Sequence, residues 1–174
     1  MNNWDIQPFV GAGALKFGMA RADTQHLLSG NEWIKRSIFN SNHTKDAYVS
    51  LGIDLQFDAD ILVVIEAYAL SSAPWVFKGI SIFEHSIESF SVAMLDVGMV
   101  ATHRYDEGCC FENIGLTVFQ PRDRETLAAL ALHSKEEFDH YLRVVGEIEE
   151  KQRERARRRS DPHYKPPRNP FLQS

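Results

Sequence analysis

Histidine and cysteine are the side chains in this sequence that most often bind metals or act in catalysis, and their spacing decides whether they could. The seven histidines include no HExxH pair, and Glu137-x-x-His140 has no second ExxH segment to complete a carboxylate-bridged metal site. Cys109 and Cys110 are adjacent, so they could join only through a strained ring, and they lack the CxxC spacing of zinc ligands. GxSxG, phosphate-loop and GxGxxG segments are also missing. We therefore predict no catalytic residue, no metal site and no cofactor, with an enzyme of unrecognised type as the alternative.

The carboxylates are more informative, because charge is unevenly distributed along the chain. Residues 1–150 contain 11 Lys and Arg against 22 Asp and Glu, a net charge of −11, whereas residues 151–174 contain 8 against 2, a net charge of +6. An acidic body favours a basic protein partner, since long-range attraction speeds encounter and selects partners. An acidic surface that merely maintains solubility is the alternative.

Carboxylates on strands and turns, together with aromatic residues at segment edges, are the residues we expect at an interface with such a partner. Trp and Tyr bury a large area at low entropic cost and make good anchors, although a core position is the alternative for each. The turn Asp58-Ala59-Asp60 should leave both of its carboxylates free for the partner. The candidate partner-binding residues are Asp54, Asp58, Asp60, Glu66, Asp106, Glu107, Glu112, Trp33, Trp75 and Tyr105.

A rival function is indicated by the basic segment after residue 150. Its cations would attract phosphate groups if they shared one helix, but no aromatic residue lies between them to stack on bases. A solvated helix end and a clasp onto the acidic body are further alternatives. The acidic body opposes nucleic acid, so nucleic-acid- or ribosome-associated binding is the second choice. The residues concerned are Lys151, Arg153, Arg155, Arg157, Arg158 and Arg159.

An internal repeat predicts the elements that position these residues. GALKFGM at 13–19 returns as GISIFEH at 79–85, and LGIDLQF at 51–57 returns as IGLTVFQ at 114–120. Two similar units side by side would form a scaffold that presents a surface.

Hydrophobic spacing gives each half a helix followed by strands. The first half is predicted to contain a helix over 20–29, a loop or irregular edge over 30–46, and strands over 47–50, 53–58 and 62–70. The second half is predicted to contain a helix over 84–97 and strands over 99–105, 111–119 and 127–132.

The predicted fold class is therefore α+β, with two tandem helix-plus-antiparallel-meander halves and a C-terminal helix. Residues 1–150 form the globular domain, with pseudo-repeats over about 10–70 and 76–133, and residues 151–174 form a basic helical extension and a Pro-rich disordered tail. The strands should form one continuous sheet or two abutting sheets. The hydrophobic seam is predicted to contain Leu55, Phe57, Ile65, Leu116 and Val118.

The segment VGAGALKFGMARADTQHLL, followed by LGIDLQFD and a strand ending in Ile65-Glu66, resembles bacterial immunity proteins of contact-dependent and polymorphic toxin systems. That family has a G…FGMSRxEV…LLG segment before LGIxLxFD, and here Ala20 and Thr24 replace its usual Ser and Val. The resemblance spans residues 10–133 and leaves the basic tail uncovered. The helix-then-meander unit also resembles, more distantly, β-lactamase inhibitor protein, in which a duplicated unit offers a concave sheet to its target.

The resemblance implies an immunity protein that binds and neutralises a cognate toxin domain, basic in charge and of nuclease or other type, by stoichiometric inhibition. The start of the chain lacks a basic segment followed by an apolar run, and the longest apolar stretch, Ile61–Ile65, is too short to span a bilayer. Two cysteines that form no disulfide suit a reducing compartment. We therefore expect a cytoplasmic protein with no membrane partner.

Overall fold

The computed structural model describes residues 3–37, 43–71, 73–105 and 107–160. The chain divides into two compact units, Met1–Phe138 and Asp139–Ser174, so the division falls ahead of the boundary predicted at residue 150. The predicted disordered tail beyond residue 160 lies outside the described residues. Across the described part of the chain, no helix is both long and apolar enough to cross a membrane.

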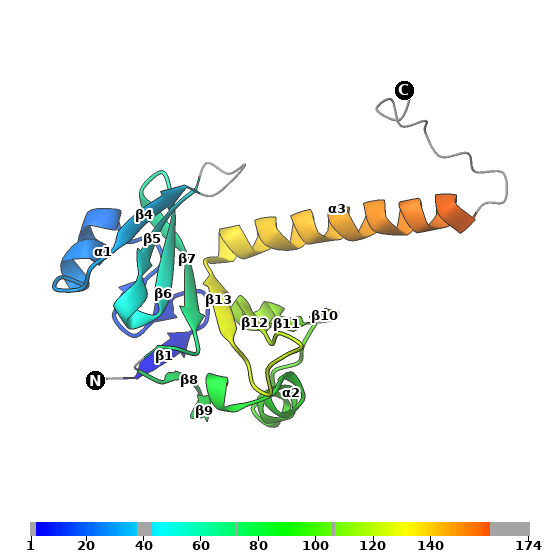
Figure 1. The fold of residues 1–174 in the computed structure, drawn as a ribbon, viewed down its shortest axis with the longest axis horizontal. Coiled ribbons are helices and arrows are strands. Elements are labelled where there is room, and N and C mark those ends of the chain that lie inside the picture. Colours follow the sequence, from blue (N-terminus) through cyan, green and yellow to red (C-terminus); the bar gives the residue numbers. More distant parts are fainter. Residues whose placement is uncertain (1–2, 38–42, 72, 106, 161–174) are drawn as a thin grey trace. The chain divides into compact units, whose positions relative to one another are not determined.

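Each half of the first unit contains short strands, a helix and a meander, coloured in sequence order in Figure 1. The first half consists of β1 (Trp4–Gln7), β2 (Gly11–Ala12), β3 (Leu15–Lys16), α1 (Arg21–Leu27), β4 (Ile34–Ser37), β5 (Thr44–Tyr48), the 3-10 helix η1 (Val49–Leu51), β6 (Ile53–Asp58) and β7 (Ile61–Tyr68). The second half consists of β8 (Trp75–Phe77), β9 (Ile80–Ser81), η2 (Ile82–Glu84), α2 (Ile87–Asp96), β10 (His103–Tyr105), β11 (Gly108–Phe111), η3 (Glu112–Ile114), β12 (Leu116–Phe119) and β13 (Ala129–His133). The long helix α3 (Lys135–Ser160) follows.

Within the described residues, eight strands form one antiparallel sheet, termed the large sheet, in the order β10-β11-β12-β13-β7-β6-β5-β4. The last strands of the two halves, β7 and β13, pair at its centre, with Ile65 opposite Leu132. The strand order is therefore symmetric about this central pair. The predicted α+β fold with two tandem helix-plus-meander halves is confirmed, and the halves share one continuous sheet.

The two halves make the same turn between their second and third meander strands, and glycine permits it. Both η1 and η3 end at a left-handed glycine, Gly52 with φ 63° and Gly115 with φ 64°. A Cβ atom on Gly52 would lie 2.9 Å from the Ser71 backbone nitrogen, and one on Gly115 would lie 2.6 Å from the Phe9 ring. The echo between Leu-Gly-Ile and Ile-Gly-Leu therefore marks a turn that other residues would strain.

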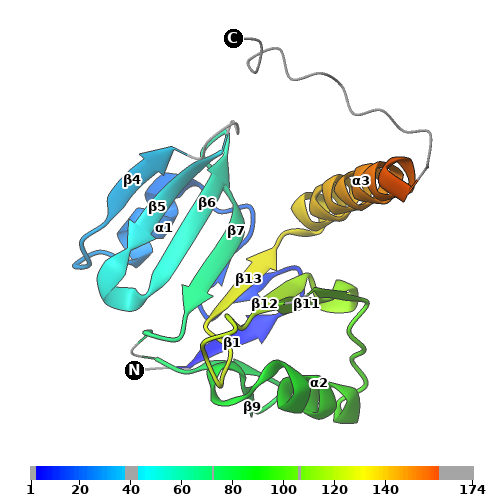
Figure 2. The same ribbon diagram turned by 45° about the vertical axis from the view of Figure 1, so that its right-hand side comes forward.

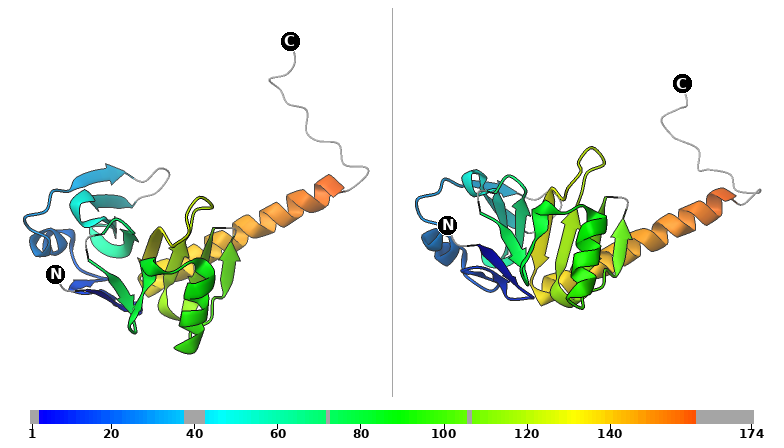
Figure 3. Two further views of the ribbon diagram at one scale, coloured as in Figure 1. Left: turned by 60° about the horizontal axis from the view of Figure 1, so that its bottom comes forward. Right: turned by 90° about the horizontal axis from the view of Figure 1, so that it is seen from below.

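The hydrophobic core lies on one face of the large sheet. Helix α2, Leu28 at the end of α1 and a small sheet, ordered β3-β2-β1-β8-β9 within the described residues, contribute to it. Phe90 of α2 meets Phe111 of β11 edge to face at 5.5 Å, which fixes α2 on this side (Figure 3). The residues predicted to form the hydrophobic seam are all buried, with 1% exposure or less. They are Leu55, Phe57, Ile65, Leu116 and Val118.

Several of the predicted boundaries are wrong. The strand predicted over 47–50 is β5, which starts at Thr44 and gives way to η1 after Tyr48. Residues 30–46 are not merely irregular, because β4 pairs with β5, with Ile34 opposite Ala47. The single strand predicted over 111–119 is the end of β11, then η3, then β12, since Gly115 turns the chain back antiparallel. The strand predicted from residue 99 starts at His103. In each case tertiary pairing, rather than local hydrophobic alternation, decides the boundary.

Candidate functional site

Two predicted carboxylates, Asp54 and Glu66, lie side by side on the face of the large sheet opposite the core. Ile53, Leu55 and Phe57 of β6 are buried, so the residues between them point to the other face. Register places Asp54 directly opposite Glu66 of β7. We term this surface of β4–β7 the Asp54 face, and Figure 2 shows α1 on the other side of these strands.

Hydrogen bonds and ion pairs join five side chains of this face, which we term the carboxylate network. The Lys45 ammonium lies 2.5 Å from Glu66 Oε2 and 3.3 Å from Asp54 Oδ2. The Tyr68 hydroxyl lies 3.1 Å from Asp54 Oδ2 and 3.2 Å from Glu66 Oε2. The Gln56 amide donates to Glu66 Oε1. A lysine, a phenol and an amide thus hold the two carboxylates in fixed positions.

The network is half-buried and acidic. The exposed fractions of the side chains are 12% for Asp54, 22% for Glu66 and 18% for Lys45. Burial, followed by the negative charges of Glu66 and Asp54, raises the pKa of Tyr68, so its hydroxyl stays protonated and can donate. Within the network, two carboxylates face one ammonium, which leaves one negative charge in excess.

A pocket of about 210 Å³ opens beside the network. Asp54 and Tyr68 line it together with Arg36 of the edge strand β4. Val49 and Leu70 also line it, and they are 70% and 85% exposed. This site therefore places a carboxylate, a phenol and a guanidinium beside large exposed apolar side chains.

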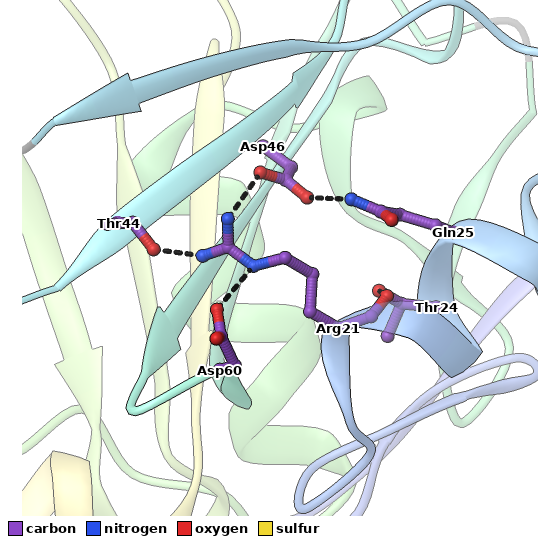
Figure 4. Close-up of polar contacts among 6 residues, drawn as sticks. All are labelled: Arg21, Thr24, Gln25, Thr44, Asp46 and Asp60. Carbon is purple, nitrogen blue, oxygen red and sulfur yellow. Dashed lines mark hydrogen bonds and ion pairs between the residues drawn. The ribbon is translucent and has the colours of Figure 1, made fainter.

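A second polar cluster lies on the core side, between α1 and the sheet (Figure 4). The Arg21 guanidinium lies 3.2 Å from Asp46 Oδ1 and 3.0 Å from Asp60 Oδ1, and its carbon is 4.4 Å from the centre of the Phe57 ring. It also donates to Thr44. Arg21 and Asp46 are buried, with side chains 9% and 0% exposed. The cluster ties α1 to β5, to β6 and to the turn between β6 and β7, so we assign it to stability rather than to binding.

Asp60 is exposed at the turn as predicted, with its side chain 75% exposed, but its Oδ1 pairs with Arg21, so the carboxylate is not wholly free for a partner. The tight turn between β6 and β7 is present, with left-handed Ala59 and Asp60. Asp58 is exposed at the end of β6. Replacing both acidic residues of this turn would thus also disturb the buried arginine.

The aromatic residues predicted to anchor a partner differ in their exposure to solvent. Trp75 is 1% exposed and stacks on Trp4 with ring centres 5.2 Å apart, so the prediction that it anchors a partner is wrong. Its position in β8, paired with β1, puts it in the core. Trp33 is 40% exposed and precedes β4. The side chain of Tyr105 lies outside the described residues.

Two predicted carboxylates of the second half, Glu107 and Glu112, are distant in sequence from the network and have partners of their own. Glu107 lies 3.4 Å from Arg122. Glu112, in η3, lies 2.9 Å from His103. Asp106 lies outside the described residues. These contacts leave both described carboxylates partly exposed, at 53% and 37%.

Three members of the site, Lys45, Gln56 and Tyr68, are not among the candidate partner-binding residues predicted from the sequence. Gln56 and Tyr68 each lie two residues from a predicted carboxylate on the same strand, and this period-two spacing was a usable signal. Lys45 had no such signal, because its strand was not predicted to begin before residue 47.

Among the described residues, no group of three or more His, Cys, Asp or Glu side chains is arranged to hold a metal ion. Comparison of the chain with known protein families, curated proteins and solved structures found no match.

Proposed function

We propose that this chain is an immunity protein that binds a cognate basic toxin domain in the cytoplasm and neutralises it by stoichiometric inhibition. The observation that carries the proposal is the acidity of the first unit. Residues 1–138 contain 10 Lys and Arg against 18 Asp and Glu, a net charge of −8. Inhibition by occlusion needs complementary charge and rigid contact groups rather than a reactive site.

The duplicated sheet supports this proposal because it supplies a rigid platform. Main-chain pairing fixes Asp54 and Glu66 on adjacent strands, and side-chain hydrogen bonds fix their carboxylates. Preorganised contact groups lose little entropy on binding, which favours affinity. The sequence resemblance to immunity proteins points to the same class of partner.

The test is co-expression with the product of the immediately upstream gene. We expect the two proteins to co-purify in equal amounts and to elute as one complex in size-exclusion chromatography. We also expect this chain to protect cells that produce the protein encoded by the upstream gene. A neighbour that is not toxic, together with no tight complex, would contradict the proposal.

The basic helix provides a rival function that the same experiment can address. Nucleic-acid binding through Lys151, Arg153 and Arg157 of α3 would be steeply salt-dependent. Glu150 lies three residues before Arg153, and Glu154 lies three residues before Arg157, a spacing that suits ion pairs within one helix.

Deletion of residues 151–174 separates the two functions. Toxin neutralisation should survive this deletion, whereas nucleic-acid binding through the basic helix would be lost.

A further inference from the structure

The pseudo-symmetry of the large sheet allows each residue of the carboxylate network to be compared with its counterpart in the second half. Asp54 pairs with Glu66 as Thr117 pairs with Ala131, and Lys45 pairs with Gln56 as Gly108 pairs with Phe119. The Tyr68 amide donates to the Gly52 carbonyl as the His133 amide donates to the Gly115 carbonyl. The counterparts of the five network residues are therefore Gly108, Thr117, Phe119, Ala131 and His133.

The network is thus not required by the architecture. The same five sheet positions hold small, apolar or neutral residues in the second half, since burial lowers the pKa of His133 to about 4. Placing Asp54, Glu66 and Lys45 at half-buried positions costs desolvation, which their mutual attraction and hydrogen bonds must offset. A charged cluster that one copy of the scaffold does without is better explained by binding than by folding.

The apolar rim of the pocket shows the same asymmetry. The shared turn aligns Val49 with Glu112, and the Tyr68–His133 equivalence aligns Leu70 with Lys135. The first half therefore exposes two large apolar side chains, Val49 and Leu70, at positions where the second half has charged side chains. Exposed apolar groups beside fixed polar groups are typical of the centre of a protein interface.

The charge of the surrounding unit favours a cationic group. The carboxylate network has one negative charge in excess, the Arg36 guanidinium that also lines the pocket offsets this excess, and the unit as a whole has a net charge of −8. We propose that the Asp54 face receives an arginine side chain of the partner, with its guanidinium at Asp54 and against the Tyr68 ring, and with neighbouring apolar residues covering Val49 and Leu70. A guanidinium suits both walls, because it pairs with carboxylates and stacks on aromatic faces. Only the identity of the partner rests on the proposed function.

Arg36 makes the sign of the ligand testable, since it also lines the pocket and would repel a cation. Removing its charge should strengthen arginine binding, whereas an anionic ligand would lose affinity. Removing the charge of Asp54 should do the opposite. The two substitutions therefore predict opposite changes for one ligand.

The experiment is a titration of the full chain, labelled with nitrogen-15, with acetyl-Leu-Arg-Leu-amide and with the matched neutral peptide in which citrulline replaces arginine. We expect the arginine peptide, at concentrations up to about 10 mM, to shift the amide signals of Gly52, Asp54 and Tyr68, and to bind about tenfold more tightly than the citrulline peptide. Asp54→Asn should weaken binding about tenfold and Arg36→Gln should strengthen it about threefold. Glu88→Gln, which removes an exposed charge from α2, is the control and should change nothing.

If Asp54→Asn fails to fold, Glu66→Gln replaces it, because Glu66 is more exposed. The proposal is overturned by equal binding of the two peptides, by shifts confined to other surfaces, by no shift at all, or by weaker binding of Arg36→Gln. The outcome is separate from that of the toxin experiment. If the arginine peptide binds but no toxin partner is found, the arginine site stands and the proposed function is contradicted. If a tight toxin complex forms and Asp54→Asn does not weaken it, the proposed function stands and the arginine site is contradicted.

Discussion

The buried contact between Arg21 and Asp46 makes Asp46→Asn the most informative test of what holds α1 on the sheet. The substitution keeps the shape of the side chain and removes its charge. The Arg21 side chain, which is 9% exposed, then has the solvent-exposed carboxylate of Asp60 and the Thr44 hydroxyl as its remaining partners. Breaking a buried ion pair by removing one partner costs about 3–5 kcal/mol, and we expect the lower end because these contacts remain.

Asp60→Asn is the matched control, because it removes the same charge from the same arginine at a side chain that is 75% exposed. Because solvent screens the exposed carboxylate, this ion pair should contribute little, about 0–1 kcal/mol, although its arginine is buried. Urea unfolding followed by circular dichroism measures both variants. For a slope of about 2 kcal/mol per M, Asp46→Asn should lower the midpoint by about 1.5 M and Asp60→Asn by less than about 0.5 M.

Equal midpoint shifts for the two variants would refute the argument that burial, rather than charge, sets the cost. The double variant Arg21→Met/Asp46→Leu provides a further check. Replacing a buried ion pair with apolar residues of similar size is often neutral or stabilising, so we expect it to be at least as stable as Asp46→Asn.

Other predictions concern the turn, the buried histidine and the basic helix. Gly115→Ala should destabilise the protein by about 2 kcal/mol or more in urea unfolding, because its Cβ would meet the Phe9 ring at a left-handed φ. Burial lowers the pKa of His133 from 6.5 to about 4, so the unfolded chain binds the proton first; stability from this group should be complete above pH 6.5 and fall by about 3 kcal/mol as the pH drops to 4. His133→Leu should flatten that part of the pH profile, and an unchanged slope would contradict the assignment. Deletion of residues 151–174 should leave the unfolding midpoint of the first unit unchanged, since that unit ends at Phe138.

The sequence predicts the fold well where the two halves carry the same signal. Leu51-Gly52-Ile53 and Ile114-Gly115-Leu116 repeat because both turns need a left-handed glycine before a buried strand. The alternation of β6 likewise predicts that Asp54 leaves the core. Glu66, on a more apolar strand, is aligned with Asp54 by pairing that the turn Asp58-Ala59-Asp60 fixes.

The remaining features depend on partners that local patterns do not contain. Asp60 has the sequence context of an exposed turn residue, yet its carboxylate forms an ion pair with Arg21, which is distant in the sequence. Trp75 stands beside a proline at a segment edge, yet parallel pairing of β8 with β1 buries it against Trp4. The ion pair of Asp60 and the burial of Trp75 both come from contacts between distant segments, which spacing along the chain does not encode.

The central β7–β13 pair has a consequence for biosynthesis. Ile65 and Leu132 are neighbours in the sheet but enter the chain far apart, so most of the second half must be synthesised before the edge of β7 is covered. Until then ILVVIEAY presents an apolar strand with unpaired main-chain groups, the kind of edge that recruits other chains into aggregates. Non-local pairing of this kind also slows folding. We therefore expect the first half to be insoluble as an isolated fragment, so the Asp54 face becomes available only once translation has passed β13.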